Sequence, residues 1–299
     1  MKIHIFLLVL CSGCFSNELR IGLVDSDFSY RILEQKNVKL MQLDTNEHCR
    51  EATTKVQLDR TFCLNSLHRS NLASKYDAHG DDVIRNYLLE SNTHELIAVD
   101  VTKHTDSTVF DVSMIAAYLL SESGVDVIIA TTNPDIFGLW SVGYLEEVQL
   151  FKKIMAGNKL LFWAVPNESV NLTRVRTRES SEFQSDNFFI ENNEYYWNLF
   201  LVGSLDEDNS LQSASPGENS AIREHFISYS GYSHIVANGS FKVGTSYSSP
   251  KLTGKILNLA VSCQLDLKTT MGMVRKLSKA TDLDYQPIAE AQLNPKDCD

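Results

Sequence analysis

The sequence lacks the features that mark fibrous, repetitive or polycationic proteins. It has no collagen-like or coiled-coil pattern, and no internal repeat recurs along its 299 residues. Positive charge is scarce: 27 Lys and Arg residues against 38 Asp and Glu residues leave a formal charge of −11. This balance argues against non-specific binding to nucleic acid or to an anionic membrane surface. The composition, 43% hydrophobic and 22% charged, predicts a globular chain with one large core or two smaller ones.

The N-terminus lacks an apolar run long enough to span a bilayer. Lys2 is followed by a short apolar segment at residues 3–10 and then by small residues. This pattern is typical of a secretory signal peptide, so residues 1–16 are expected to be removed on export and residues 17–299 to form the exported chain. Cleavage before Cys14 is the alternative, because residues 11–14 partly resemble a bacterial lipobox and would leave a lipidated cysteine as a membrane anchor.

Cysteine is sparse after the signal peptide, where Cys49, Cys63, Cys263 and Cys298 remain. Export favours disulfides, and four cysteines allow three pairings. We favour the local pairing of Cys49 with Cys63 and of Cys263 with Cys298. The alternative is that Cys263 is a small buried hydrophobic residue on a helix. No CxxC or histidine-rich metal-binding spacing appears after the signal peptide, so no cofactor is predicted.

Apolar runs alternate with helical patterns along the chain. Strands are expected at residues 20–25, 96–101, 125–130, 159–165 and 198–203. Helices are expected at residues 82–90, 109–121, 138–155 and 252–263, and polar surface segments at residues 31–75 and 174–194. Continuously apolar strands separated by helices favour a mostly parallel sheet covered on both faces, within one domain. Sites in such sheets form at the carboxyl ends of the strands, where Asp25, residues 131–133 and Asn167 fall.

The most informative segment is residues 244–250, Gly-Thr-Ser-Tyr-Ser-Ser-Pro. Gly244 permits a sharp turn, and Ser246 then lies at the N-terminus of a helix, where free N–H groups point outward. A nucleophile and an oxyanion donor can be built together at such a turn, although an ordinary serine N-cap is the commoner meaning of this tripeptide. Asp25 ends an earlier strand and His79 starts a helix, so the three residues follow the order Asp, His, Ser of one catalytic-triad arrangement.

At these residues the chain resembles the subtilisin-like serine proteases. Residues 244–250 are close to the nucleophile motif of that family, residues 22–26 to its aspartate motif, and residues 79–80 begin its histidine motif. Residues 161–168 look like the strand that ends in its oxyanion asparagine, and residues 201–206 like the strand after it. The resemblance extends from about residue 20 to about residue 265. It implies a three-layer subtilisin-like α/β fold with a mostly parallel sheet and helices on both faces.

The resemblance also implies the role of each site residue. Ser246 would be the nucleophile, His79 the general base and then acid, and Asp25 the residue that orients His79. The Ser246 N–H and the Asn167 side chain would hold the oxyanion. Calcium sites are frequent in this family, but no loop pattern places one here.

Two extended segments would bind the substrate backbone as added β-structure. They are residues 100–103, with Val101 and Thr102, and residues 129–133, with Ala130, Thr131 and Thr132. The second segment lacks the glycines typical of the family there, which suggests a differently shaped first pocket. A plain strand-to-helix loop is the alternative meaning of these residues.

The chain departs from the family pattern at four points. Asp27 and Pro166 stand where glycine is usual, Asp81 and Asp82 follow His79–Gly80 in place of Thr-His, and no propeptide is recognisable before the first strand. The two acids favour a protonated imidazole and predict activity that begins at a more alkaline pH. The missing propeptide suggests either unaided folding or a separate folding or inhibitory partner.

The sequence predicts a secreted serine endopeptidase that acts on protein or peptide substrates. The alternative is a low-turnover or inactive peptide- or protein-binding module of the same fold. Asn167 begins a formal N-glycosylation sequon, and a glycan there would remove the oxyanion donor. We therefore expect a bacterial periplasm, cell envelope or extracellular location, unless the sequon is skipped.

Overall fold

The computed structural model describes residues 19–45, 53–55, 61–67, 72, 78–91, 94–102, 112–132, 144–169, 171–172, 195–218, 220–232, 242–279, 283 and 285–294. Its strands are β1 (Arg20–Asp25), β2 (Val38–Thr45), β3 (Thr53–Lys55), β4 (Thr61–Ser66), β5 (Glu95–Asp100), β6 (Val127–Ala130), β7 (Leu160–Ala164), β8 (Leu199–Leu205) and β9 (Phe226–Ser230). Its helices are α1 (His79–Glu90), α2 (Val112–Glu122), α3 (Tyr144–Ala156), α5 (Ser220–His225), α6 (Thr245–Ser262) and α7 (Leu267–Lys279), with short 3-10 turns η1 (Tyr30–Glu34) and η5 (Glu290–Leu293).

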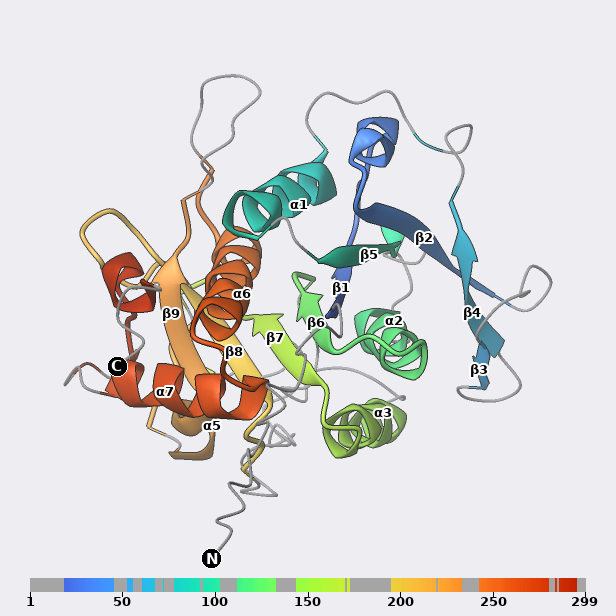
Figure 1. Ribbon diagram of the computed structural model, residues 1–299. Helices are drawn as coiled ribbons and strands as arrows, with labels where there is room; N and C mark the ends of the chain where they lie inside the picture. Colours follow the sequence, from blue (N-terminus) through green and yellow to red (C-terminus); the bar gives the residue numbers. More distant parts are fainter. Residues whose placement is uncertain are drawn as a thin grey trace, which may run out of the picture.

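The strands form one sheet in the order β3-β4-β2-β5-β1-β6-β7-β8-β9. The strands from β2 to β9 in this order are parallel, and β4 and β3 add an antiparallel edge. Helices α2 and α3 cover one face of the sheet, and α1 and α6 cover the other (Figure 1). This arrangement confirms the expected three-layer α/β fold with a mostly parallel sheet.

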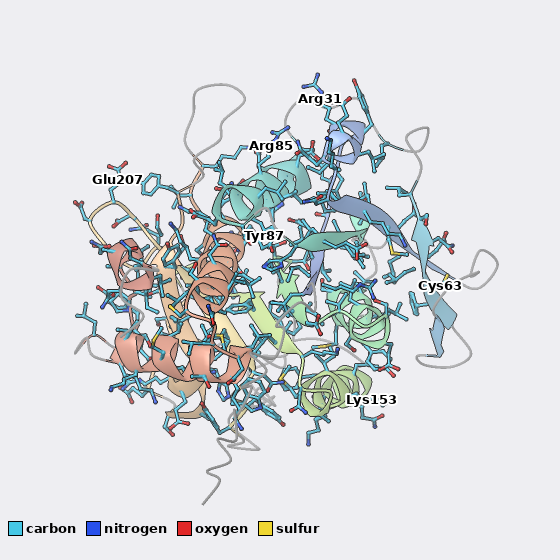
Figure 2. All side chains as sticks on the ribbon, in the orientation of Figure 1. Arg31, Cys63, Arg85, Tyr87, Lys153 and Glu207 are labelled. Atoms are coloured by element: carbon cyan, nitrogen blue, oxygen red, sulfur yellow. The ribbon has the colours of Figure 1, made fainter. Side chains whose placement is uncertain are left out.

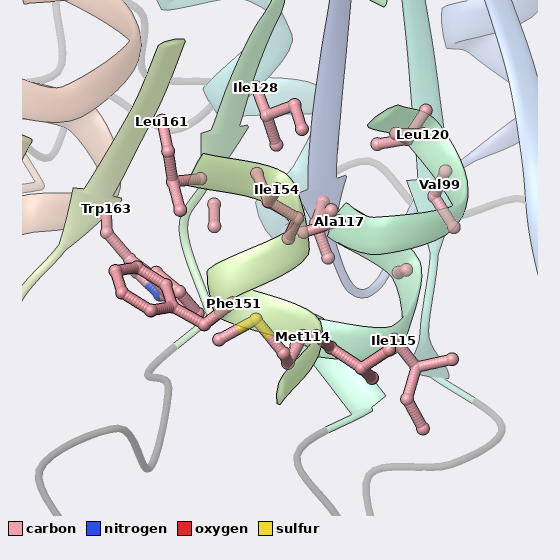
Figure 3. Packing of buried hydrophobic residues seen from close by; sticks show 14 of the residues in the cluster. Val99, Met114, Ile115, Ala117, Leu120, Ile128, Phe151, Ile154, Leu161 and Trp163 are labelled. Atoms are coloured by element: carbon pink, nitrogen blue, oxygen red, sulfur yellow. The ribbon is translucent and has the colours of Figure 1, made fainter. Parts of the chain in front are cut away.

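Alternate residues of the central strands face opposite helical layers. In β6, Ile128 belongs to the core under α2 and α3, whereas Ile129 belongs to the core under α1 and α6. Figure 3 shows the first of these cores, where Met114 and Phe151 from the two helices lie near Trp163 of β7. Because both faces are buried, the central strands are almost entirely apolar between their ends, which is the signal that made them recognisable.

The expectation of a surface segment at residues 31–75 is wrong for the described part of that segment. It contains β2 and β4, which extend the sheet beyond β5. In β2, Leu40 and Leu43 are buried while Lys39 is exposed, so polar residues interrupt the apolar run. The pairing of β2 with β5 joins segments more than fifty residues apart, and the local composition of β2 does not indicate this distant partner. Strand β9 and helices α5 and α7 were also not predicted.

Cys63 and Cys263 lie on opposite sides of the molecule. Cys63 is buried in β4, next to the edge strand β3 (Figure 2), whereas Cys263 is the C-cap of α6, shortly before α7, on the other side of the molecule (Figure 1). A bond between these two cysteines is therefore excluded. Their expected partners, Cys49 and Cys298, lie outside the described residues, so the local pairing stays a prediction.

The expected signal peptide, with Cys14, also lies outside the described residues. Among the helices that the structure describes, none has both the length and the apolar character needed to cross a bilayer.

Helices α1 and α6 pack side by side at Gly254. A Cβ on Gly254 would lie 2.7 Å from the Glu90 Cβ and 3.2 Å from the Tyr87 carbonyl oxygen, so only glycine fits this crossing. Tyr87 lies eight residues after His79, and Gly254 lies eight residues after Ser246, which is about 12 Å along each helix axis. The crossing therefore places the N-termini of the two helices, with His79 and Ser246, at the same edge of the sheet.

We expect Gly254→Ala to lower the free energy of unfolding by about 1–3 kcal/mol, because the added methyl group forces the two helices apart. The matched control is Gly272→Ala in α7, where an added Cβ has no atom within 4 Å. This control is expected to raise the free energy of unfolding by about 0.5–1 kcal/mol through helix propensity. Urea denaturation followed by circular dichroism measures both, and equal effects of the two substitutions would contradict the close crossing.

Candidate active site

A buried carboxylate and a partly exposed imidazole meet at the carboxyl end of β1. Asp25 is the last residue of β1, and its side chain is 1% exposed. Its Oδ1 lies 2.9 Å from Nδ1 of His79 and accepts the Ser26 N–H at 2.6 Å. His79 is the first residue of α1, and its side chain is 38% exposed. The carboxylate thus holds one ring nitrogen from the protein side and leaves the imidazole accessible to solvent.

Ser246 lies in the first turn of α6 and is 7% exposed. Its hydroxyl donates to the Thr131 carbonyl at a distance of 3.4 Å. The neighbouring Tyr247 ring packs against the His79 ring, with centroids 5.7 Å apart. Ser246 and His79 are therefore brought to one place by adjacent helices, but no hydrogen bond joins them among the described residues. Catalytic hydrogen bonds are often long before substrate binds, so this geometry is compatible with a nucleophile and its base.

The N-terminus of α6 presents an unused N–H group beside an oriented amide. The Tyr247 N–H donates to the Gly244 carbonyl, and the Thr245 N–H and hydroxyl donate to Asn167 Oδ1 at 2.9 and 3.0 Å. These bonds assign the oxygen of the Asn167 amide to Thr245 and leave its Nδ2 as a donor. The Ser246 N–H has no acceptor within the described part of the chain. Together these two donors are of the kind that can hold a developing oxyanion.

The two segments expected to bind a substrate backbone flank β1. Val101 and Thr102 follow β5, and the Val101 N–H donates to the Asp25 carbonyl at 3.0 Å. On the other side Ala130 ends β6, and the Thr131 N–H donates to the Val24 carbonyl at 3.1 Å.

Thr132 follows directly, and its carbonyl accepts the indole N–H of Trp163 at 3.1 Å. The structure therefore brings all five expected substrate-binding residues to the same edge of the sheet as Asp25. Residues 103 and 133, at the ends of the two segments, lie outside the described residues.

The environment of His79 raises its imidazole pKa above the ordinary value of 6.5. Burial lowers this pKa, but the hydrogen bond and the negative charge of Asp25 outweigh burial. Lys242 lowers the pKa by its positive charge, and Asp82 raises it. The direction agrees with the sequence expectation, and the hydrogen bond to Asp25 is the main reason for it.

Asp81 and Asp82 have different surroundings, although they are adjacent in the sequence. Asp82 forms ion pairs with Lys242 at 2.9 Å and with Arg85 at 3.2 Å, so its charge is largely balanced. Asp81 instead accepts two hydrogen bonds from Ser29. Of the two acids, Asp82 is the one whose charge is among the main influences on the pKa of His79.

Sequence reasoning missed Lys242 and Tyr247, although both contribute to the surroundings of His79. Tyr247 could have been found, because it directly follows Ser246 within the nucleophile motif. Lys242 carries no local signal, because its pairing with Asp82 spans 160 residues.

The described residues contain no group of three or more His, Cys, Asp or Glu side chains arranged to hold a metal ion.

We expect Lys242→Gln to raise the pKa of His79, because it removes a positive charge that disfavours the imidazolium ion. If His79 is a general base, the acidic limb of the pH–rate profile then moves to higher pH. Imidazole NMR measures the pKa directly. The control is Lys255→Gln. Lys255 lies in α6 and pairs with Glu90 at the end of α1 opposite to His79, so its removal should leave the pKa of His79 unchanged. A downward shift, or equal shifts in both variants, would contradict this account of the electrostatics.

No protein-family model matches the sequence, and no curated protein matches it either. Solved structures do match. The epidermin leader peptide processing serine protease of Staphylococcus aureus is 12% identical with a TM-score of 0.56, over 93% of this chain and 75% of that protein. The nisin leader peptidase of Lactococcus lactis is 11% identical with a TM-score of 0.55, over 93% and 87%. A lanthipeptide protease is 14% identical with a TM-score of 0.54, over 92% and 86%. These matches show that the chain has a subtilisin-like fold.

Proposed function

We propose that the chain is a secreted serine endopeptidase that hydrolyses peptide bonds through Ser246, His79 and Asp25. The observation that carries this proposal is the 2.9 Å contact between His79 Nδ1 and the buried Asp25 carboxylate, at the edge where α6 presents Ser246. A carboxylate in this position selects the tautomer in which Nε2 is free to accept a proton. The fold is shared with three proteins that are proteases or peptidases by name, one of them a serine protease, and this supports the proposal.

The reaction would proceed through an acyl-enzyme. The Ser246 hydroxyl first rotates from the Thr131 carbonyl toward His79 Nε2, which takes its proton as Oγ attacks the substrate carbonyl carbon. The Ser246 N–H and Asn167 Nδ2 hold the resulting oxyanion. The imidazolium then donates its proton to the leaving amine, and Asp25 stabilises the charged ring. Water, activated by the same imidazole, hydrolyses the acyl-enzyme.

The proposed substrate is an extended peptide or an exposed protein segment. Strands β5 and β6 lie on the two sides of β1, which ends at Asp25. We propose that a substrate strand forms backbone hydrogen bonds with residues 100–103 after β5 and with residues 129–133 after β6. Two of the similar structures are leader peptidases by name, which supports a peptide substrate. No cofactor enters the proposed mechanism.

The proposed location is outside the cytoplasm, in a bacterial periplasm, cell envelope or medium. The charged start and apolar segment of residues 1–16 support export. In the alternative form of this proposal, the signal peptide is cleaved before Cys14, and the lipidated cysteine anchors the exported chain to a membrane. We further propose that the chain either folds unaided or depends on a separate folding partner. Refolding from denaturant with full recovery of near-UV circular dichroism would rule out that dependence.

The second candidate is a peptide-binding module with little turnover. It is favoured by the hydrogen bond from the Ser246 hydroxyl to Thr131, which leaves the serine turned away from its proposed base. The departures from the family pattern around Asp25 and His79 favour it as well. Such a module would keep the binding edges of β5 and β6 without an activated nucleophile.

Reaction with a fluorophosphonate probe distinguishes the two candidates. An activated serine is labelled covalently, so we expect the full chain to be labelled and Ser246→Ala to remain unlabelled. Ser249→Ala is the matched control, because Ser249 is a buried serine of the same helix and is expected to leave labelling intact. No labelling of a chain with native circular dichroism would favour the binding module or an enzyme that awaits a partner.

We expect Asn167→Ala to slow the labelling of Ser246 by about 10²–10³-fold, because one oxyanion donor is lost. The control is Asn171→Ala, which removes an asparagine four residues away on the same connection. The measurement is the second-order rate constant for labelling at fixed pH. Equal rates for Asn167→Ala and the unmodified chain would remove Asn167 from the proposed oxyanion site.

A further inference from the structure

Three contacts join the residues that follow β1 to the first turn of α1. The Gly80 N–H donates to the Asp27 carbonyl at 3.2 Å. The Phe28 ring lies directly on Gly80, where an added Cβ would approach it to 2.4 Å. The Ser29 N–H and hydroxyl donate to Asp81 Oδ1 and Oδ2 at 2.9 and 2.5 Å. Asp27, Phe28 and Ser29 thus engage the two successive residues Gly80 and Asp81.

The last of these contacts is deeply buried. Ser29 is fully buried and Asp81 is 2% exposed, so water does not compete for their hydrogen bonds. Both oxygens of Asp81 are engaged by one residue, which prevents the carboxylate from rotating. Arg85, one helical turn later, pairs more closely with Asp82 but also lies 3.9 Å from Asp81 Oδ2, where it offsets part of the charge of Asp81. This arrangement resists displacement more strongly than a single exposed hydrogen bond would.

The position of this contact matters because of what lies beside it. Asp25 stands two residues before Asp27, and His79 stands next to Gly80. Asp27 has a φ of 60°, a left-handed conformation that turns the chain from β1 toward α1. Asp27 and Asp81 are also two of the points at which the chain departs from the subtilisin-like pattern. Both departures fall within the same junction, which suggests that they work together.

We propose that Ser29 and Asp81 form a clasp that positions His79 against Asp25. Asp81 is in this account a positioning residue that acts through His79 and does not touch substrate. The clasp sets the separation between β1 and the first turn of α1, and hence the 2.9 Å contact between His79 Nδ1 and Asp25 Oδ1. The inference rests on the proposed function for its catalytic consequence, whereas its geometric content stands independently of activity.

The charged and aromatic groups around His79 allow an effect of geometry to be distinguished from an effect of charge. His79 is faced by Asp25 from β1, Asp82 from its own helix, Lys242 from the segment before α6, and Tyr247 from α6. Asp81 is not among the main influences on the pKa of His79. Removing the charge of Asp81 while keeping the clasp should therefore leave His79 unchanged, whereas opening the clasp should weaken its bond to Asp25.

The first test is an NMR titration of the His79 imidazole in the full chain. Asp81→Ala is expected to lower the pKa of His79 and to broaden the resonance of its Nδ1 proton, because the bond to Asp25 loosens. Asp81→Asn is expected to keep both near their original values, because its amide still accepts the Ser29 N–H and donates to the Ser29 hydroxyl. Asp266→Ala, an exposed carboxylate at the start of α7, is the control.

Equal shifts for Asp81→Ala and Asp81→Asn would overturn the clasp and assign the effect to charge. If Asp81→Ala fails to fold, Ser29→Ala decides, because it removes one bond and keeps the other. This variant is expected to shift the pKa of His79 downward by less than Asp81→Ala, and an unchanged pKa in Ser29→Ala would overturn the proposal.

The second test measures turnover of a peptide substrate. Asp81→Ala is expected to lower kcat at least tenfold with KM unchanged, and Asp81→Asn to recover most of the loss. If KM rises while kcat is unchanged, Asp81 acts in substrate binding and the positioning role is wrong. If the unmodified chain has no activity and Ser246 is not labelled, the proposed function fails, and the NMR titration still decides whether the clasp exists.

Discussion

The parallel packing of α1 against α6 is the constraint on which the candidate site depends. Each helix carries one proposed catalytic residue at its N-terminus. The crossing at Gly254 places the two N-termini at the same edge of the sheet. A glycine is needed there because the backbone of one helix meets the side chains and carbonyls of the other within van der Waals distance. The sheet below then supplies Asp25 from β1, so three distant segments meet at one edge.

Electrostatics at this edge are arranged in two parts. Asp25 is buried and directed at His79, where it favours the charged imidazole. Asp82 and Lys242 form a second pair whose opposing effects on His79 partly cancel. Asp81, although adjacent to Asp82, is engaged with Ser29 and belongs to the packing of the junction. A net charge of −11 therefore says little about the site, because local pairing decides which charges act.

The sequence predicted the parts of the fold that are buried on both sides. The strands β1, β5, β6, β7 and β8 were recognisable as short, mostly apolar runs, and α6 because Leu252, Ile256 and Leu259 recur at helical spacing. Strand β2 was missed because it alternates with polar residues such as Lys39 and gains its stability from pairing with β5. The burial of Leu40 and Leu43 depends on that pairing and on the layer above it.

The sequence by itself predicted the identity and the order of the candidate site residues, because Asp25, His79, Asn167 and Ser246 lie in short motifs that resemble those of the subtilisin-like proteases. It also determined the alternation of strands and helices that requires a covered parallel sheet. Only the tertiary structure decided that Asp81 bonds Ser29, that Lys242 reaches Asp82, and that the Ser246 hydroxyl points to Thr131. These are contacts between segments far apart in the chain, and their geometry depends on how whole layers pack.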